Sequence, residues 1–395
     1  MTGIARIQDV TTGPRLSALP PLSLYVHLPW CVRKCPYCDF NSHPTRNAIP
    51  ESEYVDALIA DLEQALPDIW GRRVYTIFFG GGTPSLFSAQ AIEQLLGAFR
   101  ARLHLVSDAE ITLEANPGTF EAEKFRDYRA AGVNRLSIGI QSFNAGHLRA
   151  LGRIHDADEA RRAIEIAQRY FENYNLDVMY ALPEQTLDQA RADVQAAIAT
   201  GAPHLSFYHL TLEPGTPFHQ APPPVPDDDA SADIHDLVVA SLEAAGYVHY
   251  ETSAYAKLGR QCRHNLNYWR FGDYLGIGAG AHSKLSFHDR IVREARHRLP
   301  KNYMERVAQG NAVHERRVLT RKELPFEFML NAMRLSDGFA VSEFVERTGL
   351  QIAAAEAGLR EAEAKGLIER TYERIRPNAR GQRYLNDLLE LFLRD

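Results

Sequence analysis

The chain has 395 residues, which is too long for one small hydrophobic core, so we expect two or three domains. Hydrophobic residues make up 45% of the chain and charged residues 24%, ordinary values for a globular protein that exclude wholesale disorder. The 44 Lys and Arg residues against 50 Asp and Glu residues give a net charge of −6, which predicts no general affinity for nucleic acid or for an anionic membrane.

The first residues and the cysteine usage both bear on the compartment. Residues 1–22 carry no apolar signal core, and we expect them to form a loosely ordered lead-in. No apolar run approaches the roughly 18 residues that a membrane-spanning helix needs. Three of the 4 cysteines lie between Cys31 and Cys38, which is unlike the disulfide framework of a secreted protein. A reducing cytoplasm is therefore the expected location.

A predicted strand over Ser23 to Leu28 leads directly into a cysteine-rich loop. Three residues separate Cys31 from Cys35, and two separate Cys35 from Cys38. Thiolates at this spacing can converge on one metal centre, and iron–sulfur clusters and zinc both prefer thiolate ligands. Three ligands on a four-iron cluster would leave one iron open to a small molecule.

A structural zinc site is the plain alternative for these cysteines. Such sites usually take four protein ligands in two close pairs, and the sequence offers no second pair of cysteines. A fourth ligand would have to come from distant Cys262 or His264. The spacing therefore favours an iron–sulfur cluster over zinc.

Strands and helices alternate from Leu24 to Leu210, which predicts a parallel sheet covered by helices. Periodicity alone leaves open whether this sheet is doubly wound or closed into a barrel. The pattern predicts helices at Glu51–Leu66, Ser88–Leu103, Asp158–Phe171 and Leu187–Ala199, and strands at Ser23–Leu28, Val74–Phe79, Glu110–Glu114, Arg135–Gln141, Leu176–Tyr180 and Leu205–Leu210.

Small and polar residues follow the ends of these strands, where parallel α/β folds build their sites. A glycine triplet lets the backbone approach a ligand closely, although it also occurs in simple tight turns. Each polar residue taken alone is equally well explained as a surface residue. The set comprises Gly81, Gly82, Thr83, Glu114, Gln141, Arg153 and Asp177.

The second half of the chain differs in composition. A stiff proline-rich linker, Pro222 to Pro226, precedes an acidic stretch suited to a helix N-terminus. Residues 322–395 predict three helices and then a hairpin near Gly366 to Pro377, the order of a winged helix. Acidic residues offset the arginines near the predicted wing, so a structural or protein-docking role is favoured over that of a DNA-binding transcription factor. The arginines are Arg370, Arg374, Arg376 and Arg380, and the offsetting residues are Glu361, Glu363, Glu369 and Glu373.

The cysteine loop, with an aromatic residue before its last cysteine, resembles the CxxxCxxC signature of radical S-adenosylmethionine (SAM) enzymes. Gly80 to Pro84 is similar to the GGTP motif of the same superfamily. Three longer segments resemble the oxygen-independent coproporphyrinogen III oxidase family, and most closely its heme chaperone branch. They are Tyr25 to Trp30, Arg135 to Asn144 and His264 to Trp269. The resemblance runs from about Tyr25 to the C-terminus.

This resemblance implies an α/β fold in which a partial (β/α)6, TIM-like barrel carries a mostly helical, winged-helix-like C-terminal domain. The implied organisation is the lead-in 1–22, a radical SAM core 23–255, a connecting segment 256–320, and the C-terminal domain 321–395.

The resemblance also implies cofactors and their contacts. Cys31, Cys35 and Cys38 would bind a 4Fe-4S cluster whose open iron takes SAM. Tyr25, Gly81 and Glu114 would contact that SAM. The residues that match the oxidase's second SAM site are Tyr37, Gly82, Thr83, Gln141, Arg153 and Asp177.

A heme chaperone is the function that the resemblance implies, with heme as cargo and acceptor hemoproteins as partners. An electron donor would be needed if SAM is cleaved, nucleic acid is not an expected partner, and membrane association is expected only through partners. His264, followed by Tyr268 and Trp269, is a candidate heme ligand. The alternative is a polar cap whose aromatic rings pack at the barrel mouth, and Cys262 and His282 are weaker candidates.

The second hypothesis is an oxygen-independent coproporphyrinogen III oxidase, or an enzyme acting on a related tetrapyrrole. The oxidase has an additional cysteine two positions after its third cluster cysteine, where this chain has Phe40. That difference makes decarboxylation of coproporphyrinogen doubtful and leaves open whether the chain is an enzyme. Cluster and SAM binding do not depend on it.

Overall fold

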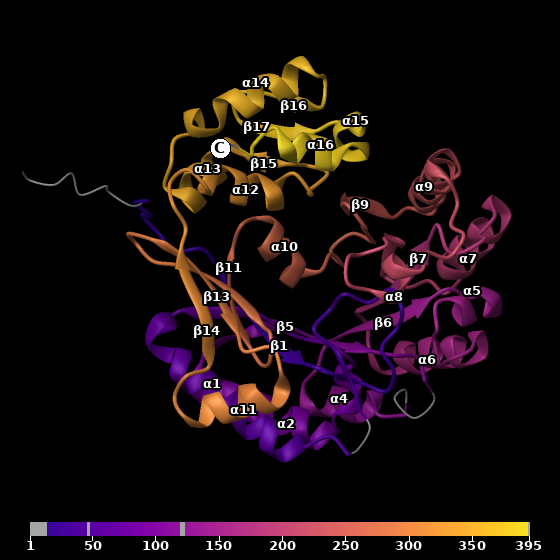
Figure 1. Cartoon of the computed structure of the whole chain (residues 1–395), viewed down its shortest axis with the longest axis horizontal. Coiled ribbons are helices and arrows are strands. Elements are labelled where there is room, and N and C mark those ends of the chain that lie inside the picture. The colour runs from indigo at the N-terminus through magenta and orange to yellow at the C-terminus, as the bar shows by residue number, and fades with distance from the viewer. Residues whose placement is uncertain (1–13, 46–47, 119–122, 394–395) are drawn as a thin grey trace, which may run out of the picture.

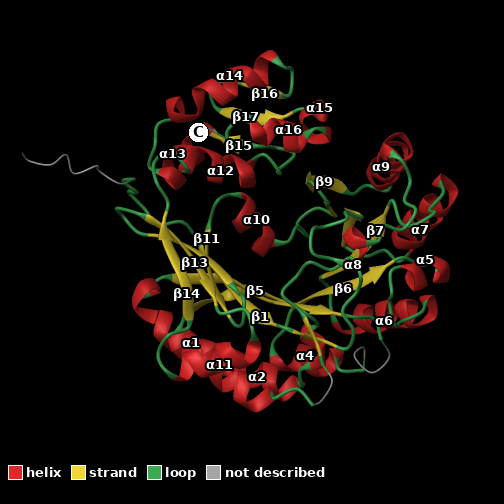
Figure 2. Cartoon of the chain, in the orientation of Figure 1, coloured by secondary structure: helices red, strands yellow, loops and turns green. Residues whose placement is uncertain are grey.

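The computed structural model describes residues 14–45, 48–118 and 123–393. Within them, 12 strands form one large sheet, and the strands in its centre run parallel (Figures 1 and 2). Across the sheet, these parallel strands are β11 (Asp273–Ile277), β1 (Leu22–Leu28), β4 (Arg73–Gly81), β5 (His104–Ala115), β6 (Arg135–Gln141), β7 (Tyr174–Tyr180) and β8 (His204–His209).

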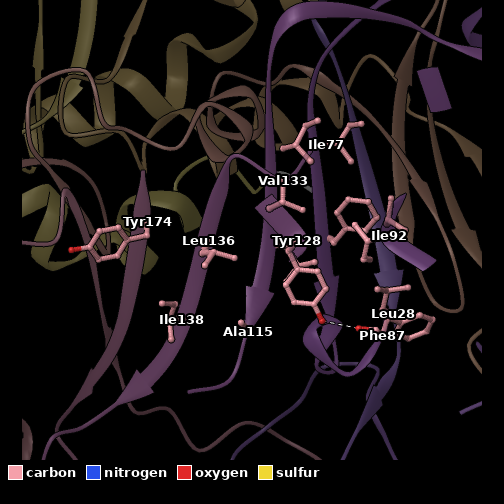
Figure 3. Packing of buried hydrophobic residues seen from close by; sticks show 14 of the residues in the cluster. Leu28, Ile77, Phe87, Ile92, Ala115, Tyr128, Val133, Leu136, Ile138 and Tyr174 are labelled. Carbon is pink, nitrogen blue, oxygen red and sulfur yellow. Dashed lines mark hydrogen bonds between the residues drawn. The ribbon is translucent and has the colours of Figure 1, made fainter. Parts of the chain in front are cut away.

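Helices cover the convex face of this sheet (Figure 1). Alternate residues of each strand point toward them, so Val26, Ile77 and Leu136 are fully buried in one continuous core. Figure 3 shows this layer, in which the Tyr128 hydroxyl donates to the carbonyl oxygen of Phe87 at 2.7 Å. The covering helices include α1 (Glu51–Ile69), α2 (Ala89–Arg102), α4 (Phe125–Ala131), α6 (Ala157–Tyr170), α7 (Leu187–Ala199), α9 (Asp228–Ala244) and α11 (Pro300–Ala308).

The opposite side chains of the same strands face inward and are largely polar. Thr76, Glu110 and Arg135 are at most 5% exposed there, and β4 and β5 pair Thr76 with Glu110. The Thr76 hydroxyl bonds to Ser23 and His264, and the Glu110 carboxylate accepts backbone N–H groups of residues 263 and 264, whereas Arg135 Nε has no hydrogen-bond partner among the described residues. The interior of the barrel is therefore polar and not a second apolar core.

The predicted fold class is confirmed, with one addition. The segment 256–320, expected only to connect two domains, contributes β11 beside β1 and then three antiparallel strands at that edge of the sheet. The domain boundaries themselves stay a prediction. The added edge strands are β12 (His282–Ser286), β13 (Ile291–Arg296) and β14 (Val313–Val318), and the other edge carries β10 (Ala254–Ala256) and β9 (Val248–Glu251).

The C-terminal unit has its own core, formed around Phe328, Phe339 and Phe344. Its hairpin falls where the turn signals predicted it. The unit consists of α12 (Leu324–Ala332), β15 (Phe339–Ala340), α13 (Val341–Thr348), α14 (Glu356–Ala364), β16 (Ile368–Arg370), β17 (Arg374–Pro377), α15 (Ala379–Arg383) and α16 (Leu385–Glu390).

Helix α10 (Arg263–Trp269) lies between the sheet and the C-terminal unit (Figure 1). The remaining short elements are β2 (Trp30–Cys31), β3 (His43–Pro44), a 3-10 turn at Pro84–Leu86, α5 (Ala145–Ala150), α8 (Pro217–Gln220) and a second 3-10 turn at Ile352–Ala355. A search of the described helices finds none with the length and apolar character to span a membrane.

Candidate functional site

The cysteine loop is held in place by its own backbone and by hydrogen bonds to two distant loop segments. The Cys38 N–H donates to the Cys35 carbonyl at 3.1 Å. Asn41, just after the loop, donates through Nδ2 to the carbonyls of Ala279 and Arg298, both at 2.9 Å. These contacts join the loop to the segments that follow β11 and β13, so residues 238 and 257 positions away help to fix its shape.

The three cysteines of the loop are free thiols. The guanidinium of Arg153 donates to the Cys35 sulfur at 3.8 Å, and the Cys38 sulfur lies 3.6 Å from the Ser42 hydroxyl. Burial raises the pKa of Cys31. Hydrogen-bond donors beside the sulfurs stabilise thiolates, so this donor set fits a cluster that is bound through three sulfurs.

Among the residues that the structure describes, no three His, Cys, Asp or Glu side chains are close enough together to hold a single metal ion. A four-iron cluster binds each thiolate to a separate iron, and its ligands therefore stand farther apart than those of a single ion.

The glycine segment after β4 packs directly on the cysteine loop. The Gly82 N–H donates to the Leu28 carbonyl at 2.8 Å, and the Thr83 N–H donates to the Trp30 carbonyl at 2.7 Å. A Cβ atom at Gly81, whose φ is +119°, would lie 2.7 Å from the His27 ring, and one at Gly82 would lie 2.5 Å from the Trp30 carbonyl oxygen. Larger residues would therefore push the two loops apart.

Tyr25, Gly81 and Glu114, the residues expected around the cluster-bound SAM, come together at this point. The Gly81 N–H donates to Glu114 Oε2 at 3.2 Å, and a Cβ atom at Gly80 would touch both Tyr25 and Glu114. The Tyr25 hydroxyl lies 3.0 Å from His27 Nδ1. Burial, together with the nearby Asp177 carboxylate, raises the pKa of Glu114 to about 8.

Residues expected at a second SAM site lie close by: the Asp177 carboxylate acts on Glu114, and a Cβ atom at Gly139 would lie 3.0 Å from the Gln141 amide and 3.4 Å from the Arg153 guanidinium. The Ser137 hydroxyl and the Asn175 amide donate to the Asp177 carboxylate, and burial raises the Asp177 pKa. Gln141 ends β6 with a φ of +66°, a strained conformation for a residue other than glycine. Tyr37 packs against Phe218 with 6.4 Å between ring centroids.

Asn116 belongs to this constellation, although the sequence did not mark it as a site residue. Its Nδ2 donates to the Thr83 hydroxyl at 3.0 Å, and its Oδ1 accepts from Arg153 at 2.7 Å. Its position two residues after Glu114, in the turn that ends β5, was the available signal. A cavity of about 420 Å³ opens beside Cys35, and Thr83, Asn116 and Arg153 line it.

His264 lies elsewhere. Its Nδ1 is 2.8 Å from the Thr76 hydroxyl, and its ring centroid is 5.0 Å from that of Phe78. Thr76 precedes Gly81 by five residues on β4, so it lies about 16 Å from the glycine segment along the strand.

The His264 side chain is deeply enclosed. The residue is 2% exposed, its Nε2 has no partner among the described residues, and burial lowers its pKa to about 3. The Glu110 carboxylate accepts the backbone N–H groups of Arg263 and His264 at 3.2 and 3.1 Å, while the Cys262 sulfur lies 3.7 Å away. This geometry has the features of the polar cap considered above, and a role as heme ligand stays a prediction.

Comparison with protein families matches residues 25–197 to the Radical SAM superfamily and residues 319–384 to the HemN C-terminal domain. The heme chaperone HemW of Escherichia coli K12 is 51% identical over 377 residues, which cover 95% of this chain and 99% of that protein. This chain belongs to the HemW family.

More distant relatives also match over most of their length. HemW of Bacillus subtilis is 32% identical over 94% of this chain and 99% of its own. The bovine mitochondrial radical S-adenosyl methionine domain-containing protein 1 is 34% identical over 97% of this chain and 90% of its own. Among solved structures, E. coli coproporphyrinogen III oxidase HemN is similar with a TM-score of 0.81 and 25% identity, covering 95% of this chain and 90% of that one. The family resemblance read from the sequence is thereby confirmed.

Proposed function

We propose that this HemW-family protein is a cytoplasmic heme chaperone, which binds heme and transfers it to acceptor hemoproteins while carrying a 4Fe-4S cluster and SAM. The observation that carries the proposal is the 51% identity to a protein named heme chaperone over nearly the full length of both chains. The intact cysteine loop and the glycine segment packed on it support the cofactor part.

In this proposal Cys31, Cys35 and Cys38 hold the cluster. When bound, such a cluster supplies single-electron chemistry to SAM, whereas the protein supplies binding and position. Arg153 places a positive charge 3.8 Å from the Cys35 sulfur and so offsets part of the negative charge of the thiolates.

Glu114 is suited to receive a cationic group of SAM. With no cation beside it, burial keeps much of this carboxyl group protonated near neutral pH, since its pKa is about 8. An ammonium group would favour the carboxylate, so Glu114 would release its proton on binding. Gly81 already donates to the same carboxylate and fixes its orientation. Tyr37, Gly82, Thr83, Gln141, Arg153 and Asp177 stand as the proposed contacts of a second SAM.

The alternative function is that of the coproporphyrinogen III oxidase, which the TM-score of 0.81 to HemN favours. Phe40 argues against the oxidase function, because its exposed side chain occupies the position at which the oxidase has an additional cysteine. Formation of protoporphyrinogen from coproporphyrinogen III by anaerobically reconstituted protein with SAM and reductant would establish the oxidase.

Heme titration tests the chaperone proposal. Reconstituted protein is titrated with heme and followed by its absorbance, and the loaded protein is then mixed with an apo-hemoprotein. We expect saturable binding followed by transfer. A protein that binds no heme, or that never releases it to an acceptor, contradicts the proposal.

A further inference from the structure

The cavity beside Cys35 has apolar walls that are unusually exposed. Val32 is 52% exposed and Ile154 is 65% exposed, and both line the cavity together with Leu86. The two loops that carry them are in contact, because a Cβ atom at Gly152 would lie 3.0 Å from the Pro36 ring. Exposed aliphatic side chains gathered around one concave site are a sign of a ligand surface.

The charges of this cavity are mainly positive, although the protein as a whole carries −6. Arg33 and Arg153 both line it, and because the Arg153 guanidinium already faces the Cys35 sulfur, Arg33 is the cation available to a ligand. Within the described chain, the side chain of Arg33 is exposed and takes part in no ion pair or hydrogen bond. Glu159, the carboxylate of the lining, is already engaged, since it accepts the backbone N–H of Asp156 at 3.1 Å. The ligand that fits is therefore apolar over its body and anionic at one edge.

We propose that this cavity holds the heme cargo, with the porphyrin faces against Val32, Leu86 and Ile154 and the propionates directed toward Arg33. The inference rests on the proposed chaperone function. The volume of about 420 Å³ lies within the roughly 300–1,000 Å³ of ligand pockets. The cargo would lie next to the cluster loop and remote from His264.

A rim site also suits transfer. Cargo held against Val32 and Ile154, whose side chains are half exposed or more, can pass to another protein without unfolding of the barrel, whereas cargo on His264 would require α10 to leave its buried position. Thr83 and Arg153 line the same cavity and are among the proposed contacts of a second SAM, so heme and a second SAM exclude each other there.

The test compares heme titrations of full-length, anaerobically reconstituted variants. Ile154→Asp places a carboxylate in the apolar wall, and Arg33→Glu reverses the charge at the edge. We expect each to raise the heme Kd by about tenfold or more, because both oppose a ligand that is apolar and anionic. Leu258→Asp is the matched control, since Leu258 is 96% exposed and does not line the cavity. It should bind heme as the wild type does, and the iron content of all variants should be equal.

The outcomes separate this inference from the function on which it rests. If the wild type binds heme and Ile154→Asp and Arg33→Glu bind it equally well, the cavity is not the heme site, while the chaperone function stands. If those variants instead lose a second equivalent of SAM with unchanged heme affinity, the cavity belongs to SAM. If the wild type binds no heme, the chaperone function itself fails.

Discussion

The two halves of the barrel interior use polar residues for opposite purposes. At the carboxyl ends of the strands, Glu114 and Arg153 border the cysteine loop and an open cavity. Nearer the amino-terminal part of the strands, Thr76 and Glu110 form hydrogen bonds to α10. The first arrangement leaves charged groups available to bind a ligand, and in the second the charged groups stabilise the fold. Barrel folds generally have their functional sites at the carboxyl ends of the strands and their stabilising contacts at the opposite end. A histidine-containing motif therefore need not mark a ligand site.

The largest expected effect lies at the α10 end. Glu110→Ala removes the acceptor of two helix N–H groups and a charge beside buried Arg135. We expect the free energy of unfolding to fall by about 3 kcal/mol or more, measured by chemical denaturation. Glu361→Gln, which removes an exposed pair with Lys365, should cost less than about 0.5 kcal/mol. A Glu110→Ala protein as stable as the wild type would erase the distinction between the two ends.

At the cysteine end, Cys31→Ser, Cys35→Ser and Cys38→Ser should each abolish cluster assembly, whereas Cys262→Ser should retain it. Serine is a poor ligand for a cluster that prefers thiolate. Cys262 is buried against Glu110, and burial raises its pKa to about 12. Iron content and visible absorbance after reconstitution report the result. Loss of iron in the Cys262 variant would show that the two ends cooperate in metal binding.

Glu114→Gln should weaken SAM binding by about tenfold, since it removes a carboxylate that would receive a cation. Isothermal titration calorimetry of the reconstituted protein measures this. Wild-type binding should also release a proton below pH 8, visible as a dependence of the heat on the buffer. Equal affinity in Glu114→Gln would place SAM elsewhere.

The same residue predicts a pH dependence of stability. The folded-state pKa of Glu114, about 8, lies above its ordinary 4.5, so the folded protein binds the extra proton between these values. The contribution of Glu114 to the free energy of unfolding is therefore full below pH 4.5 and is lost as pH rises toward 8. Denaturation of cluster-free wild type and Glu114→Gln across this range should show a steeper decline for the wild type. Parallel curves would contradict the raised pKa.

The smallest effect is expected at Phe40. Because its side chain is 65% exposed, Phe40→Cys should change the free energy of unfolding by no more than about 0.5 kcal/mol. Neither wild type nor variant is expected to convert coproporphyrinogen III, assayed by chromatography of the porphyrin products. Activity in the variant alone would show that this one position separates the chaperone from the oxidase.

The sequence predicted those helices and strands whose signals lie within a few neighbouring residues. The strand Arg135–Gln141 and the helix Leu187–Ala199 have the predicted bounds, because their periodicity and flanking turns lie within a few residues. The closeness of Gly81 and Glu114 followed from their placement at the ends of parallel strands, whereas Tyr25, in the middle of β1, was included only because the family resemblance implied it.

Features that depend on long-range pairing were not predictable in this way. The pairing of β11 with β1 aligns Tyr25 with Gly276, some 250 residues apart, and no local sequence signal near either residue predicts this pairing. The burial of His264 likewise depends on Thr76 and Glu110, which belong to separate strands. Asn116 was missed because its role follows from its contacts with Thr83 and Arg153.

The tether at Asn41 has a consequence for cofactor insertion. Its two hydrogen bonds fix the end of the cysteine loop, and the glycine segment fixes the beginning, before any iron arrives. Ordering a free loop would cost about 1–2 kcal/mol of backbone entropy per residue, and here folding has already met that cost. The three thiols therefore meet an incoming cluster as a preorganised set.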